Sequence, residues 1–192
     1  MESNTATPGP PARPRHKVTY EEYASWPEDG RRYEILDGEA VELSSPGRKH
    51  QEVLGRLWRV FDDYFRKTTE GKAWFAPLDV VPEEHWVVQP DIVAVARENL
   101  RIVGDKAVMG VPDLLVEVLS PSTRARDRGI KREFYGRIGV RELWLVDVDE
   151  RRLWQYARQE GALREAGTRR HDERFGSVAF PGLVVALGEV WV

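Results

Sequence analysis

Glu117 is the residue whose surroundings point most directly to chemistry. It occupies the middle of an otherwise apolar run, residues 113–119 (Asp-Leu-Leu-Val-Glu-Val-Leu), which has the length and composition of a buried β-strand. A carboxylate buried there without a partner costs several kcal/mol. Such a group is normally paired with a cation, protonated or bound to a metal ion. We therefore expect Glu117 to belong to a functional site.

Cations gather directly after this predicted strand. The segment from Arg124 to Arg137 carries more cations than acids, and Lys131 is among them. A buried acid, a cation-rich helix start and further acids on neighbouring strands are the parts needed to hydrolyse a phosphodiester with a metal ion. A solvated helix face explains the charges alone equally well. Their position immediately after Glu117 favours the functional interpretation.

A metal site requires a second acid close to Glu117. Magnesium takes hard oxygen ligands, usually one or two carboxylates together with waters and substrate phosphate. Asp113 lies on the same strand face as Glu117, but four residues of strand, at about 3.3 Å each, separate the two by ~13 Å. The second ligand is therefore expected from a neighbouring strand, with Asp91 best placed and Asp79 the second choice. The alternative for Asp91, which follows a proline, is a simple turn or strand-edge role.

Lys131 is the candidate for positioning the nucleophile. A lysine near a metal-bound water and the scissile phosphate orients the water and stabilises developing negative charge. A helix predicted over about 127–138 begins just beyond the Glu117 strand, so its first turn returns Lys131 towards the site. The alternative is an ordinary surface ion pair with Asp127 at i−4. Arg126 and Arg128 are expected to contact substrate phosphates or to be plain surface charges.

The elements that must position these residues are a mixture of predicted helices and strands. Residues 33–43 predict a hairpin around Asp37-Gly38, a turn that tolerates positive φ, and helical spacing predicts a helix over about 48–67. Ile130, Phe134 and Ile138 are expected to form the buried stripe of the 127–138 helix. Residues 97–112 look irregular. Strands are predicted over residues 74–81, 86–88, 91–96, 113–119, 142–148, 151–157, 178–180 and 183–187. This order indicates an α/β (α+β) fold, with a mixed β-sheet flanked by helices and an N-terminal β-hairpin.

Length and composition limit the class of protein. The 192 residues are 41% hydrophobic, which fits one domain over residues 16–192 after a flexible tail at 1–15. The absence of cysteine excludes disulfides, thiolate zinc sites and a cysteine nucleophile, and suits a cytoplasmic location. No apolar run approaches the ~20 residues of a membrane helix. The net charge of −3 argues against coating nucleic acid by bulk charge, but it permits a local basic patch.

Several motifs together resemble the Uma family, a large group assigned as restriction endonucleases with the PD-(D/E)xK nuclease fold. They are Gln89-Pro90-Asp91, residues 112–123 (Pro-Asp-Leu-Leu-Val-Glu-Val-Leu-Ser-Pro-Ser-Thr), Asp127-Arg128-Gly129-x-Lys131 and residues 142–147 (Glu-Leu-Trp-Leu-Val-Asp). Residues 33–39, 76–80 and 180–183 are similar to its flanking segments. The match runs from about residue 18 to the C-terminus and is specific as a set.

The resemblance implies roles for individual residues. Asp91 would be the acid of the PD motif and Glu117 the acid of the (D/E)xK motif, both binding Mg²⁺ or Mn²⁺. The lysine position of the motif holds Leu119, and the family's lysine lies on the following helix, which here gives Lys131. Glu39 and His50 lie where the family's first hairpin and helix approach the site. The alternative for His50 is a capping or surface role.

The expected function is therefore metal-dependent hydrolysis of DNA phosphodiester bonds, with a backbone carbonyl near Val118 as a further ligand. Two alternatives stay open. One is a catalytically silent binding or regulatory protein that keeps the nuclease fold, and the other is a metal-dependent hydrolase of a small phosphorylated substrate. Cutting both strands would most simply use a homodimer. The apolar C-terminal segment with Trp191 supplies either an interface or a cover for the core.

Overall fold

The computed structural model describes residues 16–192, so the predicted tail at 1–15 lies outside the described residues. A short helix, α1 (Tyr20–Ala24), precedes the predicted N-terminal hairpin, which is confirmed as β1 (Arg32–Leu36) paired with β2 (Glu39–Leu43). Its turn residues Asp37 and Gly38 have φ of 53° and 82°, as a tight two-residue hairpin turn requires. The predicted helix over 48–67 is also confirmed, as α2 (Arg48–Lys67).

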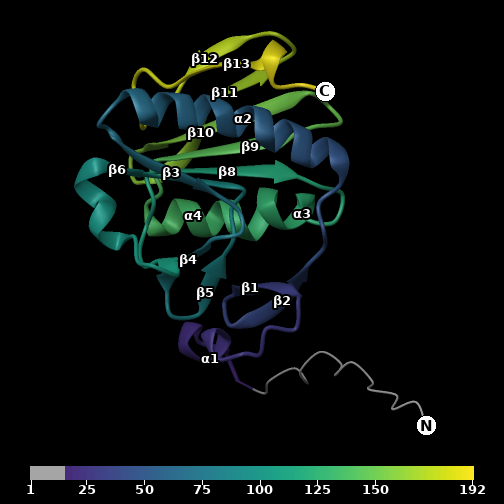
Figure 1. Cartoon of the computed structure of the whole chain (residues 1–192), viewed down its shortest axis with the longest axis vertical. Helices are drawn as coiled ribbons and strands as arrows, with labels where there is room; N and C mark the ends of the chain where they lie inside the picture. Colours follow the sequence, from purple (N-terminus) through teal and green to yellow (C-terminus); the bar gives the residue numbers. More distant parts are fainter. Residues whose placement is uncertain (1–15) are drawn as a thin grey trace.

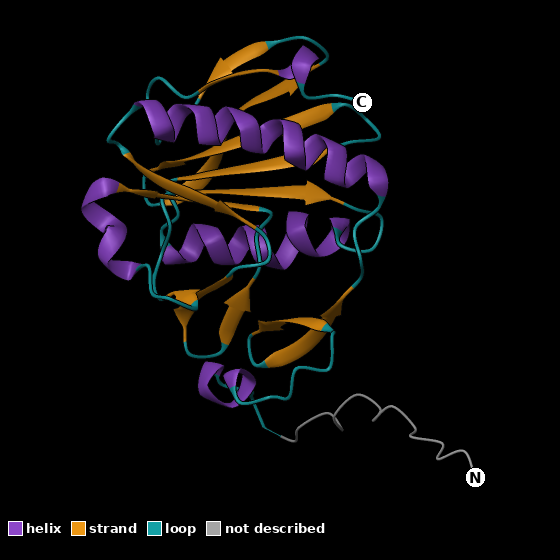
Figure 2. Cartoon of the chain, in the orientation of Figure 1, coloured by secondary structure: helices purple, strands orange, loops and turns teal. Residues whose placement is uncertain are grey.

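A six-stranded mixed sheet lies at the centre of the fold, in the order β11-β10-β9-β8-β6-β3 (Figure 1). Its strands are β3 (Gly71–Phe75), β6 (Ile92–Ala96), β8 (Leu114–Leu119), β9 (Glu142–Asp147), β10 (Arg152–Gln159) and β11 (Ala162–Arg170). Neighbouring strands are antiparallel except β8 and β9, which are parallel. Helix α2 covers one face, and the helical segment after β8 lies on the other (Figure 2).

A second sheet packs below the first, in the order β2-β1-β5-β4-β7. Its remaining strands are β4 (Asp79–Glu83), β5 (Trp86–Val88) and β7 (Ala107–Val108). The single strand predicted over 74–81 is wrong, because these residues are divided between β3 in one sheet and β4 in the other. Pro77 lies at the break, and proline has no N–H with which to continue a strand ladder. The expected irregular stretch 97–112 contains a 3₁₀ helix, η1 (Arg97–Ile102), as well as β7.

The helical segment after β8 differs in register from the prediction. It consists of α3 (Arg124–Arg126), a π-helical turn η2 (Asp127–Lys131) and α4 (Arg132–Ile138). Ile130, expected in the buried stripe, is 44% exposed, whereas Phe134 is buried as expected and Ile138 is partly buried. The wider π turn, with non-helical dihedrals at Gly129, rotates the helix so that Lys131 enters the interior in place of Ile130.

The C-terminal region holds further differences. Strand β11 was not predicted; it is an edge strand rich in charge that pairs with β10. The short strands are β12 (Arg174–Gly176) and β13 (Val184–Ala186), followed by the 3₁₀ turn η3 (Leu187–Glu189). Residues 178–180 are not a strand, because the N–H groups of Val178 and Ala179 turn inward to the buried carboxylate of Glu142. Trp191 is buried in the core beneath α2, so within this chain it covers the core.

Two hydrophobic cores sandwich the central sheet. One lies between the sheet, α2 and the C-terminal strands, and the other lies between the sheet, α4 and the second sheet. The predicted α+β class, with a mixed sheet flanked by helices, is therefore confirmed. No helix among residues 16–192 is long and apolar enough to cross a membrane.

Candidate active site

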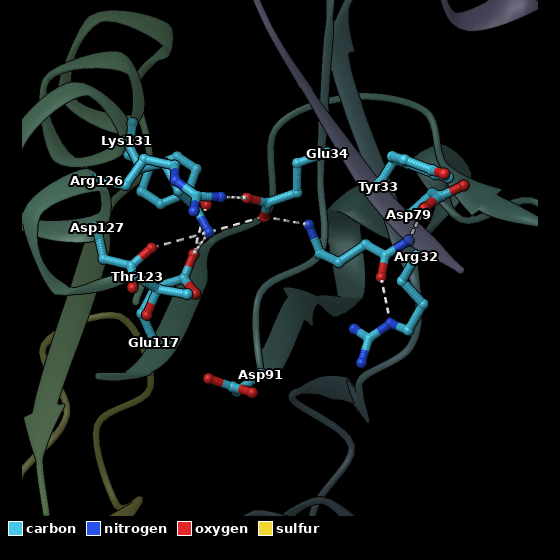
Figure 3. Close-up of polar contacts among 12 residues, drawn as sticks. Arg32, Tyr33, Glu34, Asp79, Asp91, Glu117, Thr123, Arg126, Asp127 and Lys131 are labelled. Carbon is cyan, nitrogen blue, oxygen red and sulfur yellow. Dashed lines mark hydrogen bonds and ion pairs between the residues drawn. The ribbon is translucent and has the colours of Figure 1, made fainter. Parts of the chain in front are cut away.

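A cleft of 270 Å³ opens where the β1–β2 hairpin, the start of α2, the ends of β6 and β8, and η2 meet. Acids and bases from distant parts of the chain line it. They are Glu34 on β1, His50 on α2, Asp91 just before β6, Glu117 on β8, and Asp127 and Lys131 on η2. Figure 3 labels all of these side chains except that of His50.

The pairing of β6 with β8 brings Asp91 and Glu117 together. Ile92 lies opposite Val116 in this antiparallel pair, so one further step of the register places Asp91 opposite Glu117. Side chains of directly opposed residues share one face of a sheet. The Asp91 carboxylate also reaches β8, where Oδ2 accepts a 2.7 Å hydrogen bond from the Val118 N–H. Asp113, in contrast, lies at the other end of β8 and accepts hydrogen bonds from Ala96 N and Asn99 Nδ2.

Lys131 lies among three carboxylates. Its Nζ is 2.6 Å from Glu117 Oε1, 2.8 Å from Glu34 Oε1 and 3.3 Å from Asp127 Oδ1. All four residues are buried. The ion pair with Asp127 that the i, i+4 spacing suggested is present, but it is buried and not a surface pair. Three carboxylates around one ammonium leave this cluster with an excess of negative charge when all of them are ionised.

Burial and these contacts shift the pKa values of the cluster. Burial raises the pKa of Glu117 to about 8 against the opposing effect of Lys131, and Asp127 and Glu34 add to the rise. Burial alone would lower the pKa of Lys131, but Glu117 and Glu34 outweigh it and raise that pKa well above its ordinary value. Burial, then the Glu117 carboxylate, likewise raises the pKa of Tyr135. The Tyr135 hydroxyl is therefore protonated at neutral pH and donates a 2.6 Å hydrogen bond to Glu117 Oε1.

The second-tier candidates divide between the cleft and other places. His50 lines the cleft, with Nε2 3.0 Å from Asp91 Oδ1. Asp79 lies outside it, because β4 belongs to the second sheet and its carboxylate faces a separate pocket. Glu39 begins β2, is exposed and does not line the cleft; Glu34 on the partner strand of the hairpin does.

The two arginines expected to meet substrate phosphates lie in different environments. Arg126 NH1 is 3.8 Å from Glu34 Oε2, which ties this side chain to the acid cluster. Arg128 lies outside the cleft, with its guanidinium 4.3 Å from the ring centroid of Trp154. It is a surface charge stacked on an aromatic ring, the alternative considered for it.

Glu34 and Tyr135 are the members of the cluster that the sequence analysis missed. Glu34 carries the same signal as Glu117, an acid between apolar neighbours in a predicted strand, but in a shorter strand. Tyr135 follows Lys131 by four residues, as Lys131 follows Asp127, so the three side chains share one helical face. That spacing is a signal that a search for acid–base clusters would detect.

The donor set fits a hard divalent cation held with few protein ligands. Within residues 16–192, no group of three or more His, Asp or Glu side chains converges as a ready metal-binding cluster. Asp91 and Glu117 nevertheless direct two carboxylates into one cleft. Magnesium commonly uses one or two carboxylates with waters and substrate phosphate, so two are sufficient.

Comparisons with known proteins bear on this site. The chain matches the family model Uma2, described as "Putative restriction endonuclease", over residues 20–188. It is 29% identical over 127 residues to "Uncharacterized protein slr1290" of Synechocystis; the match covers 65% of this chain and spans 65% of that protein's length. It also resembles a crystal structure of "a putative nuclease belonging to DUF820" from Anabaena variabilis, with a TM-score of 0.70, 19% identity, and coverage of 91% of this chain and 97% of that one. At that identity the likeness shows the fold.

Proposed function

The chain belongs to the Uma2 family, described as putative restriction endonucleases, and we propose on this premise that it is a metal-dependent endonuclease hydrolysing phosphodiester bonds in DNA. One observation carries the proposal. The buried Glu117 lies opposite Asp91 at the edge of a cleft and contacts the equally buried Lys131. Buried acids that share a cleft with a buried base are costly for folding, so a functional role is the simplest reason for them.

Asp91 and Glu117 would hold Mg²⁺ or Mn²⁺, and Glu34 and Asp127 are further acids that line the same cleft. When bound, such an ion supplies Lewis-acid activation of water and neutralises charge on the scissile phosphate. Both oxygens of Asp91 are held by the protein, by His50 on one side and by the Val118 N–H on the other. Tyr135 and Lys131 both contact Oε1 of Glu117, which orients that carboxylate.

Lys131 contributes the positive charge that this chemistry needs. Its ammonium carries three N–H donors, which here face Glu117, Glu34 and Asp127. A donor redirected from a carboxylate to a phosphate oxygen would stabilise negative charge as it develops.

We expect the protein to form a homodimer, so that one protomer acts on each strand of a duplex. Sedimentation analysis of the purified protein tests this expectation by measuring its oligomeric state.

Two other functions are outcomes of the same test. Hydrolysis of a small phosphorylated substrate is favoured by the limited 270 Å³ cleft and by the net charge of −3. A silent scaffold would keep the fold without turnover, but a cost-bearing cluster of buried acids has no role in it.

The decisive experiment is cleavage of supercoiled plasmid with Mg²⁺ or Mn²⁺ by the wild type, Glu117→Gln and Glu133→Gln. The Glu133 side chain is exposed on α4 and serves as the matched control. We expect nicking or linearisation by the wild type and the control, and a loss of at least about 100-fold in Glu117→Gln. Full activity of Glu117→Gln would exclude the assignment. Inactivity of all three, with hydrolysis of phosphorylated small molecules, would favour the alternative substrate.

A further inference from the structure

A second pocket, of 450 Å³, lies between α1 and the second sheet; we call it the α1 pocket. Its position relative to the cleft follows from strand geometry. Tyr33 and Glu34 are neighbours on β1, and successive side chains of a strand point to opposite faces. Tyr33 lines the α1 pocket, whereas Glu34 lines the cleft. The two sites are therefore back to back across β1.

Aromatic rings form the walls of the α1 pocket. Trp26 lies edge-on between Tyr23 and Tyr33, with ring centroids 5.5 Å apart in both pairs and interplanar angles of 74° and 87°. Tyr20, one helical turn before Tyr23, also lines the pocket. Three of these rings pack on a small apolar core, which is a structural role. Tyr20, Tyr23 and Trp26 nevertheless stay partly exposed and leave a hollow between them.

Asp79 places a hydrogen-bond acceptor in this hollow. Its Oδ1 accepts a 2.8 Å hydrogen bond from Gln89 Nε2. Across residues 16–192, no Lys, Arg or His nitrogen forms an ion pair with it. Burial raises the pKa of Asp79, and the hydrogen bond from Gln89 and the charge of Arg32 oppose that rise. Asp29, also in the lining, is instead neutralised by Arg31 at 3.7 Å.

The lining also contains the acid Glu28 and two cations, Lys106 and the Arg31 that is paired with Asp29. Aromatic walls, the half-buried carboxylate of Asp79 and the nearby cation Lys106 match the three parts of a nucleotide. Bases stack on aromatic side chains, a carboxylate accepts N–H from a base edge, and cations meet phosphate. A methylated ammonium ion would suit the aromatic walls and the acids but would leave Lys106 unused, and it is the competing ligand in the test.

We propose that the α1 pocket binds one nucleotide of the nucleic-acid strand, with an amino-bearing base such as guanine directed at Asp79. The inference rests on the proposed nuclease function for the origin of that nucleotide. A base from a single strand or a disrupted duplex reaches such a pocket without the cost of unstacking. Guanine presents two adjacent N–H donors to a carboxylate, whereas thymine flanks its N–H with two carbonyl oxygens that a carboxylate repels.

Gln89 connects the α1 pocket to the cleft. Its side chain donates to Asp79 from Nε2 and accepts from Arg32 Nε at 2.9 Å through Oε1, while its backbone N–H donates to Glu34. Gln89 and Arg32 also line the cleft. Figure 3 shows Asp79 and Arg32 on one side of Glu34 and the catalytic candidates on the other. Gln89 therefore contacts one acid of each site, Asp79 in the α1 pocket and Glu34 in the cleft.

The test is a calorimetric titration of the full chain with dGMP, and separately with dTMP, in the presence of EDTA. The expected result is saturable dGMP binding that dTMP does not match, weakened at least ten-fold in Asp79→Asn, a change of about 1.4 kcal/mol or more. Asp105→Asn removes an exposed neighbouring acid that does not line the pocket, and it should bind dGMP like the wild type. Trp26→Leu should also weaken binding, and circular dichroism establishes that each variant is folded.

Several results would overturn the inference. These are no dGMP binding by folded wild type, equal binding in Asp79→Asn, or binding of tetramethylammonium in place of dGMP. Because EDTA removes divalent metal, nucleotide binding does not depend on turnover. Binding of dGMP without any plasmid cleavage would refute the proposed nuclease but keep the pocket. Plasmid cleavage that depends on Glu117, without dGMP binding, would refute the pocket alone.

Discussion

At the scale of single residues, the cleft contains a buried cluster in which one ammonium contacts three carboxylates. Lys131 faces the carboxylates of Glu117, Glu34 and Asp127, and each of these groups is buried. A buried cluster with surplus negative charge is costly without a further cation. At neutral pH, protonation of Glu117, whose pKa is raised to about 8, and the nearby Arg126 guanidinium offset this surplus. A divalent cation would take the place of the Glu117 proton, so each acid can be tested on its own.

The first residue-scale prediction concerns Glu34. Glu34→Gln removes one carboxylate from the cluster while preserving its shape, and we expect Mn²⁺ affinity and DNA cleavage both to fall by about ten-fold or more. Glu39→Gln, on the same hairpin but outside the cleft, is the control and should retain both. Calorimetry with Mn²⁺ and the plasmid assay measure the two quantities. Equal behaviour of the two variants would remove Glu34 from the site.

The second concerns the pH dependence of unfolding in EDTA. The pKa of Glu117 is raised from its ordinary 4.5 to about 8 by burial. Its contribution to stability is thus fully present below the unfolded-state value and is lost as pH rises through about 8. The free energy of unfolding of the wild type should fall as pH rises from about 4.5 to about 8. Glu117→Gln cannot ionise, so it should not show this fall, and the difference between the two proteins should stay constant above pH 8. Urea unfolding across this range measures the difference; parallel curves would contradict the shift.

At the scale of elements, two local irregularities deliver the side chains. The π turn of η2 directs Lys131 inward, and the tight β1–β2 turn holds Glu34 against it. Gly38 in that turn has φ of +82°, and a Cβ there would lie 2.7 Å from the backbone Cα of Lys17. The hairpin therefore depends on glycine for both conformation and space.

Gly38→Ala tests the hairpin. The left-handed φ alone costs about 1–2 kcal/mol for a residue with a Cβ, and the clash with Lys17 adds to it. Gly30→Ala is the matched control, because Gly30 has φ of +79° but no neighbouring atom within 4 Å of the added Cβ. We expect Gly38→Ala to lose more stability in urea unfolding than Gly30→Ala, together with DNA cleavage. Equal losses would show that the contact with Lys17 is unimportant.

At the scale of the whole molecule, the two sheets share a core. Leu36, Val80 and Trp86 of the second sheet pack with Val93 and Leu115 of the central one. A core shared in this way couples the two sheets energetically. We therefore propose that residues 16–192 unfold as one domain.

The prediction is a single cooperative urea transition that coincides by tryptophan fluorescence and far-ultraviolet circular dichroism. Two packing variants provide the comparison. Phe61→Ala in the fully buried core should cost about 3–5 kcal/mol, whereas Phe75→Ala, at 51% exposure, should cost far less. Separate transitions for the two probes would show that the sheets are independent units.

The sequence alone determined what local patterns encode. The hairpin, the long helix over 48–67 and the Glu117 strand follow from turn chemistry and hydrophobic periodicity within short windows. The placement of Asp91 beside Glu117 was also accessible, because an unpaired acid in a buried strand demands a neighbour from the next strand.

Packing between distant segments sets which residues complete the cluster. Glu34 and Lys131 are 97 residues apart in the chain and meet because the second sheet packs beneath η2. The π turn that exposes Ile130 and buries Lys131 likewise depends on packing between elements. Local propensity carries no information about such contacts, since their free energy arises only when separate segments bury surface against one another.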